Sequence, residues 1–170
     1  MRSQLLAKSL RTAEPPGGKI DYDVDGKLVG NWFLEGTDFL EGEGQKYWET
    51  HLTLAYNYID PTHIQISIGS LNGKPAQFNV RGNAPDPKDV GVGQLVKYEL
   101  TGFDFVQKGT GKYWDQRTFM KDIVVQNRQE VNEVLLVKLL DRRKLKIEVF
   151  PGKSKDQVSD FTSNAKVYHR

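Results

Sequence analysis

Apolar and polar residues alternate along most of this chain, from about Lys19 to Phe150. Leucines and tyrosines occupy every second position of the segment 52–58, and isoleucines do the same in the segment 64–68. Successive side chains of an extended strand point to opposite faces of a sheet, so this period of two predicts β-strands. The pattern therefore favours an all-β fold, in which an antiparallel sheet is bent or closed around one core.

Nine segments have the composition of strands, and turn-forming pairs such as Asp-Gly at 25–26 and Asn-Gly at 72–73 separate several of them. The expected strands are Lys19–Val24, Lys27–Glu35, Tyr47–Ile59, Thr62–Gly69, Ala76–Arg81, Leu95–Val106, Phe119–Asn127, Val134–Leu140 and Lys144–Phe150. Eight or nine short strands in succession predict an antiparallel meander that closes into a barrel. A strongly curved sheet or a sandwich is the alternative.

The two ends of the chain depart from the β pattern. Leucines at near-helical spacing within Ser3–Glu14 predict a short helix or an arm, which Pro15–Gly18 then breaks. Residues 1–18 are therefore expected to be an appendage, and residues 19–170 a single barrel-like domain. Apolar residues three, four and three positions apart over 158–168 predict a second short helix packed on the sheet.

Composition excludes several classes of site. The chain has no cysteine, so it has no disulfide, cysteine–zinc site, iron–sulfur cluster or thiol nucleophile. The net charge of +2 is not that of a nucleic-acid-binding protein. No apolar run approaches the ~18 residues of a membrane span. The segment Met1–Leu10 lacks the apolar middle of a signal peptide, so either the protein stays inside the cell or a leader has been removed.

The sharpest local motif is Asp-Tyr-Asp-Val-Asp-Gly at 21–26. Its three carboxylates, Asp21, Asp23 and Asp25, alternate and precede a glycine at the sixth position, as at the start of a calcium-binding loop. The twelfth position, which should hold a bidentate glutamate, is Trp32. A strand edge running into an Asp-Gly turn accounts for the same residues, and the calcium site is kept as the alternative.

Aromatic residues near the expected strand mouths are the candidate binding residues. Tyr-Trp pairs at 47–48 and 113–114 each follow a glycine-bearing loop. Such pairs stack on sugar rings or line apolar cavities, although packing in the core and at its rim is the alternative. A small barrel is either packed or holds one small ligand. The candidate lining of such a cavity is Trp32, Trp48, Tyr56, Tyr113 and Trp114.

No catalytic constellation stands out in the sequence. Glu49 and His51 share one face of an expected strand, and further carboxylates lie in the loop 36–49. A histidine beside a carboxylate could act as acid and base or bind a metal weakly. Loop carboxylates without a defined separation do not indicate hydrolysis. We therefore expect a non-enzymatic binding or accessory domain without a cofactor, and an enzyme that uses His51 is the third hypothesis.

The Gly-Asn-Trp-Phe stretch at Gly30–Phe33 resembles the opening signature of lipocalins and other calycins. The resemblance implies a barrel in which Trp32 packs across the base and Gly30 allows a close backbone approach. It also implies a late arginine stacked on the tryptophan, which stays open among Arg142, Arg143 and Arg170. A calycin-like barrel would hold a small apolar molecule in its mouth.

A wider set of short motifs resembles a module of bacterial envelope or secreted proteins, some of which join it to murein endopeptidases. The motifs are Gly30–Phe33, His51–Leu54, Ile59–Pro61, Ser67–Gly69, Leu135–Leu139 and Leu145–Glu148. This resemblance implies a periplasmic or secreted β-domain without catalytic residues. It favours an alternative function, an envelope-interaction or carbohydrate-binding module with a filled core.

Overall fold

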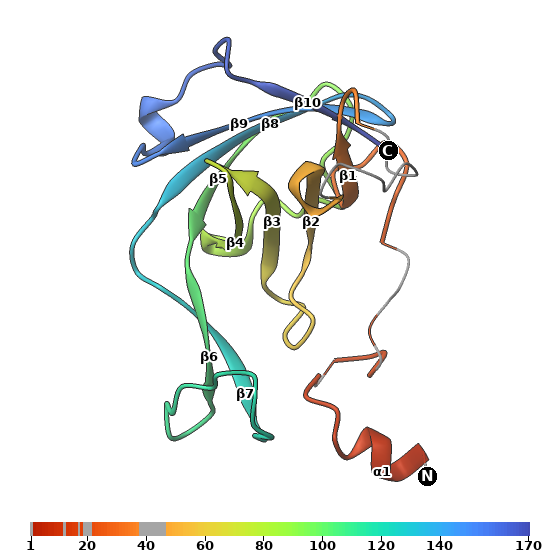
Figure 1. The fold of residues 1–170 in the computed structure, drawn as a ribbon, viewed down its shortest axis with the longest axis vertical. Coiled ribbons are helices and arrows are strands. Elements are labelled where there is room, and N and C mark those ends of the chain that lie inside the picture. The colour runs from red at the N-terminus through yellow and green to blue at the C-terminus, as the bar shows by residue number, and fades with distance from the viewer. Residues whose placement is uncertain (1, 12, 17, 19–21, 38–46) are drawn as a thin grey trace.

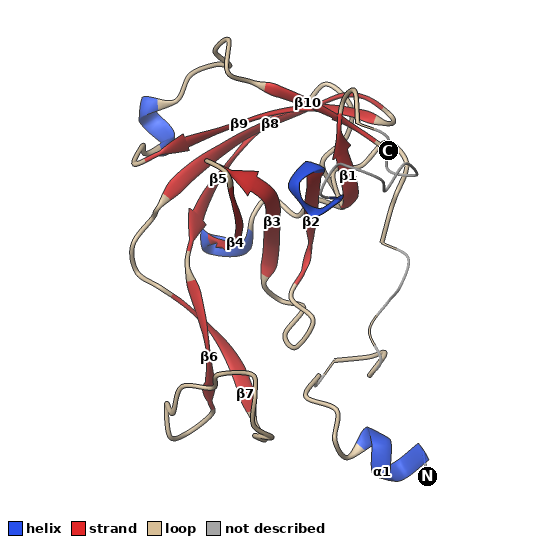
Figure 2. Cartoon of the chain, viewed as in Figure 1, coloured by secondary structure: helices blue, strands red, loops and turns tan. Residues whose placement is uncertain are grey.

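A computed structural model of the chain describes residues 2–11, 13–16, 18, 22–37 and 47–170. Eight strands form a closed antiparallel barrel, and two more form a hairpin that projects from it (Figures 1 and 2). In sequence order the barrel strands are β1 (Gly30–Leu34), β2 (His51–Tyr56), β3 (Ile64–Leu71), β4 (Lys74–Val80), β5 (Leu95–Thr101), β8 (Glu133–Asp141), β9 (Lys144–Pro151) and β10 (Lys166–His169). The prediction of an all-β barrel is confirmed.

The barrel is a meander with one insertion. Strands β6 (Phe103–Gln107) and β7 (Ile123–Asn127) pair only with each other and form an arm between β5 and β8. The expected single strand Leu95–Val106 is interrupted at Gly102, which lies between the end of β5 and the start of β6. Thr101 Oγ1 lies 2.7 Å from the carbonyl oxygens of both Arg128 and Glu130, and this contact fixes the point where the arm leaves the barrel.

The last strand corrects the expectation of a helix near the end of the chain. Strand β10 pairs with β9 on one side and with β1 on the other, so that Tyr168 lies opposite both Leu145 and Leu34. This pairing closes the barrel and leaves neither β1 nor β9 with an open edge. The only helical turn in this region is the 3-10 turn η3 (Lys155–Gln157).

Burial explains why the spacing over 158–168 resembled a helix. Val158 packs with Val134 and Leu136 on the outside of the barrel, with Phe161 beside them. Tyr168 instead belongs to the core inside the barrel. The apolar residues thus cover opposite sides of the barrel wall. Their spacing matches a helix by coincidence, because they pack in two different clusters.

The start of the chain carries the helix α1 (Arg2–Leu6), which is five residues long. Arg11 links this appendage to the barrel, since its Nη1 donates a hydrogen bond of 3.1 Å to the carbonyl of Tyr58. Of the expected strand Lys19–Val24, residues 19–21 lie outside the described part, and residues 22–24 form no strand. No helix in the described ranges is long and apolar enough to cross a lipid bilayer.

The barrel interior is filled by side chains from the inward face of every strand. The buried set comprises Leu28, Trp32, Leu52, Leu54, Ile64, Ile66, Ile68, Val80, Val90, Tyr98, Leu100, Leu135, Val137, Leu139, Leu145, Ile147 and Tyr168. Each large aliphatic side chain in it contributes roughly 1.5–3 kcal/mol through removal from water. A second cluster, Ile59, Phe105, Trp114, Ile123 and Val125, holds the arm against the barrel.

The two ends of the barrel are built differently. We call the end where β1 and β3 begin the base. There Leu28 donates its N–H to the carbonyl of Val90 over 3.3 Å, and both side chains are buried in the core. The opposite end, where β3 and β9 finish at Leu71 and Pro151, is called the mouth.

A substitution of Ile66 tests whether the core is filled, because this side chain is fully buried at the centre of β3. Replacing it with alanine, Ile66→Ala, should lower the free energy of unfolding by about 2–5 kcal/mol, since the barrel wall cannot collapse into the cavity. Urea denaturation measures the change. Leu140→Ala, at a position 41% exposed on β8, is the matched control and should change stability by at most about 0.5 kcal/mol. Equal effects of the two substitutions would contradict the packing described.

Candidate functional site

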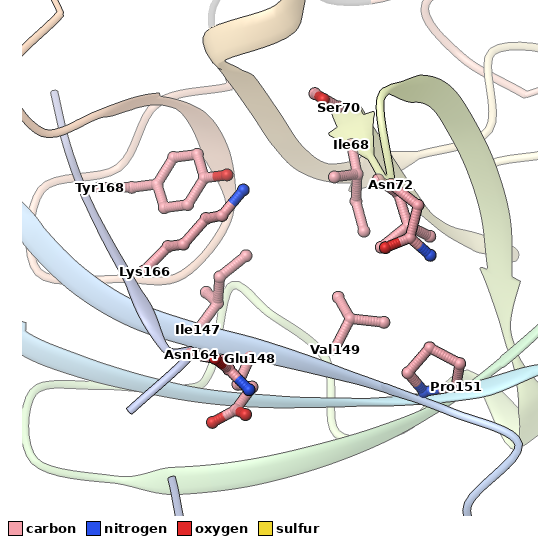
Figure 3. A pocket seen from close by; sticks show the side chains of 11 residues that line it. Ile68, Ser70, Asn72, Ile147, Glu148, Val149, Pro151, Asn164, Lys166 and Tyr168 are labelled. Atoms are coloured by element: carbon pink, nitrogen blue, oxygen red, sulfur yellow. The ribbon is translucent and has the colours of Figure 1, made fainter. Parts of the chain in front are cut away.

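A cavity of about 340 Å³ opens at the mouth of the barrel. It lies between the end of β3 and the strands β9 and β10, and Figure 3 shows Ile68 facing Tyr168 across it. Its apolar lining comes from Ile68, Leu71, Ile147, Val149, Pro151 and Tyr168, and its polar lining from Ser70, Asn72, Glu148, Asn164 and Lys166. The cavity thus combines an apolar floor with a polar rim.

Two polar groups of the rim are available to a ligand. The Tyr168 hydroxyl lines the cavity and has no hydrogen-bond partner among the described residues. Burial raises the pKa of Tyr168 to about 12, so the hydroxyl stays a neutral donor. Lys166 is exposed and forms no ion pair within the described chain. Glu148 is already engaged, because its carboxylate accepts hydrogen bonds of 2.6 and 2.5 Å from Thr162.

Sequence reasoning missed this cavity. The alternation placed Ile68 and Ile147 on the inward faces of expected strands but did not distinguish filled interior from open mouth. Tyr168 and Lys166 were missed because their segment was expected to be helical. The β-forming run Val-Tyr-His at 167–169 was the available signal for a strand there.

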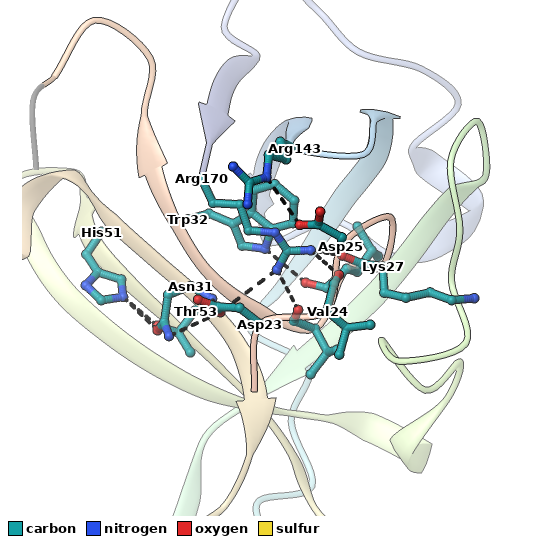
Figure 4. Close-up of polar contacts among 12 residues, drawn as sticks. Asp23, Val24, Asp25, Lys27, Asn31, Trp32, His51, Thr53, Arg143 and Arg170 are labelled. Carbon is teal, nitrogen blue, oxygen red and sulfur yellow. Dashed lines mark hydrogen bonds and ion pairs between the residues drawn. The ribbon is translucent and has the colours of Figure 1, made fainter. Parts of the chain in front are cut away.

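At the base, Arg170 stacks on Trp32, with its guanidinium carbon 3.9 Å from the ring centroid. The same guanidinium donates hydrogen bonds to the carbonyls of Val29 at 2.8 Å and Lys27 at 2.6 Å, and to that of Val24 (Figure 4). A planar fork of donors over an aromatic face suits arginine and not lysine. Burial lowers the pKa of Arg170, and the nearby carboxylates of Asp23 and Asp25 offset part of that effect.

Of the three late arginines, Arg170 is the one that stacks on the tryptophan. Arg170 covers the tryptophan, whereas Arg142 and Arg143 lie 3.7 and 3.2 Å from the carboxylate of Asp25. Gly30 permits the close approach, because its φ is +129° and a Cβ atom would lie 2.5 Å from Arg170 Nη1. The same Cβ atom would lie 2.3 Å from Asp23 Oδ1, so a side chain at this position would displace both the aspartate and the arginine.

The carboxylates of the expected calcium loop have other partners in the structure. Asp23 accepts a hydrogen bond of 2.7 Å from the backbone N–H of Asn31 and lies 3.9 Å from Arg170. Asp25 pairs with arginines, as described above. Asp21 lies outside the described residues. Within the described part of the chain, no group of three or more histidine, aspartate or glutamate side chains is placed to hold a metal ion.

Two of the predicted binding residues belong to the barrel and lie toward its base. Trp32 is fully buried, and its indole Nε1 donates a hydrogen bond of 2.9 Å to the carbonyl of Leu28. The Tyr56 hydroxyl donates to the carboxylate of Asp86, and burial raises the pKa of Tyr56. Neither side chain is among the residues that line the mouth cavity.

The other predicted binding residues lie elsewhere. Tyr113 is 62% exposed and Trp114 is 6% exposed on the arm, where Trp114 packs edge-on against Phe105 with 5.8 Å between ring centroids. Trp48 belongs to the 3-10 turn η1 (Tyr47–Thr50), and its side chain lies outside what the structure describes. The described aromatic residues therefore do not gather into one cup.

His51 sits in a polar network on the outer face of the barrel. Its Nε2 lies 3.1 Å from Asn31 Oδ1 and 2.8 Å from Thr53 Oγ1. Burial lowers the pKa of His51, and the Asp23 carboxylate offsets part of this effect. Glu49 is exposed in η1, and the remaining loop carboxylates, Asp38, Glu41 and Glu43, are outside the described residues.

The contacts of Arg170 at the base predict that replacing it lowers the stability of the protein. Arg170→Ala should lower the free energy of unfolding by roughly 2–5 kcal/mol, because it removes the stacked cation and leaves three carbonyls without their donor. Arg170→Lys should recover only part of this loss. Urea unfolding followed by tryptophan fluorescence measures both variants. Arg142→Ala, at an exposed ion pair, is the control. Its effect should stay below about 1 kcal/mol, and a similar loss in Arg142→Ala and Arg170→Ala would contradict the proposed role of the stack.

The lowered pKa of His51 predicts that the stability of the protein depends on pH. Its pKa is lower in the folded protein than the ordinary value of about 6.5, so the fold favours the neutral ring. This contribution is present above about pH 6.5 and is lost as the pH falls through the folded-state pKa. Stability measured by urea unfolding should therefore fall from pH 7 to pH 5 less steeply in His51→Gln than in the wild type. Burial raises the pKa of Glu133, which acts in the opposite direction in both proteins and cancels in their difference. Parallel pH profiles would contradict the expectation.

Comparison with known proteins identified no relative of this chain. No protein-family model matches the chain, and no match was found among curated proteins or solved structures.

Proposed function

We propose that this protein is a non-enzymatic binding domain that holds a small, largely apolar molecule with an acidic head group in the mouth of its barrel. The observation that carries this proposal is the mouth cavity of about 340 Å³, with its apolar floor and a Tyr168 hydroxyl that has no hydrogen-bond partner among the described residues. Pockets for small molecules commonly have volumes of about 300–1,000 Å³ and a few polar groups on an apolar lining. The cavity fits the lower end of that range.

The filled interior determines where the ligand would lie. Side chains such as Leu52, Leu54 and Tyr98 are fully buried below the cavity, so no ligand reaches the centre of the barrel without displacing them. Binding at the mouth requires no such rearrangement. The ligand would lay its apolar body on Ile68, Ile147 and Val149.

The polar rim supports an acidic head group. Lys166 supplies a positive charge without an ion-pair partner in the described chain, and the Tyr168 hydroxyl supplies a hydrogen-bond donor. The single carboxylate of the lining, Glu148, already accepts one hydrogen bond from Thr162 on each of its oxygens, which leaves it less capacity to bind a cationic ligand. A carboxylate or sulfonate therefore suits this rim better than an amine does.

The base supports the same proposal from the other end. Gly30, Trp32 and Arg170 have the arrangement that the calycin resemblance implies, and Arg170 bonds to the segment that crosses the base. A barrel closed at its base leaves the mouth as the entrance for a ligand. A periplasmic or secreted location, and an accessory role in the envelope, stay predictions of the wider resemblance.

The first experiment looks for bound molecules directly. Native mass spectrometry of protein purified without unfolding should show extra mass from a small passenger, and added decanoate should displace that passenger. The fluorescent probe 1-anilinonaphthalene-8-sulfonate should also bind and be displaced by decanoate. Absence of any passenger together with absence of probe binding would contradict the proposal.

Variants of the lining locate the binding. Val149→Trp should abolish probe binding by filling the cavity. Tyr168→Phe should weaken it about fivefold, as expected for one hydrogen bond of about 1 kcal/mol. Lys166→Gln should weaken binding by a similar factor and reduce its dependence on salt. Lys121→Gln, an exposed lysine on the arm, is the matched control and should bind like the wild type. Unchanged binding by Val149→Trp would place the probe elsewhere and contradict the proposed site.

A further inference from the structure

A second hollow lies where the arm leaves the barrel, and we call it the arm groove. It has a volume of about 370 Å³ and runs between the outer face of β3 and β4 and the strand β6. Its lining includes Tyr58, Gln65, Gln77, Phe103, Tyr113 and Gln116, together with Asp104, Phe105 and Arg128. None of these residues lines the mouth cavity, so the two sites are separate.

Exposed aromatic rings are the first feature of the arm groove. Tyr58 is 53% exposed and Tyr113 is 62% exposed, although both are large side chains with much apolar surface. The Tyr58 ring is supported from behind by Phe105, with 5.8 Å between centroids, and Phe105 also packs against Phe103 at 5.5 Å. Tyr58 is therefore a ring that is held in place and presents surface to solvent.

Planar amides are the second feature. The side chains of Gln65 and Gln77 point out from neighbouring strands and have no hydrogen-bond partner among the residues that the structure describes. Gln116 lies beside them, and its Oε1 is 3.4 Å from the Tyr58 hydroxyl. Each amide offers both donors and an acceptor, as needed for paired hydroxyl groups.

The charge of the arm groove is balanced. Arg128 donates hydrogen bonds of 3.0 and 2.8 Å to both carboxylate oxygens of Asp104, and each charge neutralises the other. The described lining contains no further charged residue. A polyanion such as a nucleic acid would find no free cation here to pair with its phosphates. The lining instead fits a neutral molecule that is rich in hydroxyl groups and has apolar ring faces.

We propose that the arm groove binds a neutral glycan. The faces of Tyr58 and Tyr113 would stack on the C–H faces of sugar rings, and the three glutamine amides would bond their hydroxyl groups. The Asp104–Arg128 pair forms a rigid polar edge that joins β6 to the residue following β7. This site does not depend on the mouth cavity.

The test is affinity electrophoresis in native gels cast with hydroxyethylcellulose, glycol chitin or soluble starch, supported by an array of neutral oligosaccharides. At least one of these glycans should retard the wild-type protein, with little effect of added salt. Tyr113→Ala and Tyr58→Ala should each weaken binding by roughly tenfold, in line with the loss of one aromatic stacking platform. Gln77→Ala should weaken it less.

Phe119→Ala is the matched control, because Phe119 is 65% exposed between β6 and β7 but does not line the arm groove. It should be retarded like the wild type, and saturating decanoate should leave retardation unchanged. Lack of retardation by every glycan would overturn the proposal. Undiminished binding by Tyr113→Ala and Gln77→Ala would do the same, as would retention of oligothymidylate in place of glycans.

Discussion

The contact between Arg170 and Trp32 reinforces the point where β10 and β1 close the barrel. The arginine follows β10 and the tryptophan lies in β1, so their stack joins the last barrel strand to the first. The same guanidinium holds the carbonyls of Lys27 and Val29, which ties the segment across the base to both strands. One buried cation thus connects the end of the chain to β1 and to the segment that directly precedes it, and Gly30 leaves the space for this contact.

Because the interior is filled, both proposed binding sites lie at the surface of the barrel. The mouth cavity joins an apolar floor to a tyrosine hydroxyl without a partner in the described part of the chain, whereas the arm groove joins exposed tyrosines to glutamine amides. These chemistries differ, since one suits an apolar acid and the other a neutral sugar. The two proposed sites share no lining residue, so our proposals expect each to be occupied independently of the other.

The alternation of apolar and polar residues predicted much of the barrel. The remaining elements depend on pairing between strands that are far apart in the sequence. Strict alternation in Leu52–Tyr56 and in Ile64–Ile68 predicted β2 and β3, because one face of each is buried along its length. Strand β10 was missed, since its role is to fill the gap between β1 and β9, which no local window reveals. The arm was missed because residues 95–106 read as one strand, although Gly102 divides them. The expected aromatic cup mixed Trp32 inside the barrel with Tyr113 on the arm, and alternation cannot tell these settings apart.

The arm is inserted between two strands that remain paired without it. β5 and β8 keep a continuous ladder from Leu95 to Leu100, and Thr101 then anchors both ends of the inserted segment. Four apolar residues of the arm pack together and against Ile59 of the barrel, namely Phe105, Trp114, Ile123 and Val125. The segment between β5 and β8 is therefore a place where the chain can vary in length and sequence, and the arm groove with it, while the β5–β8 ladder is kept.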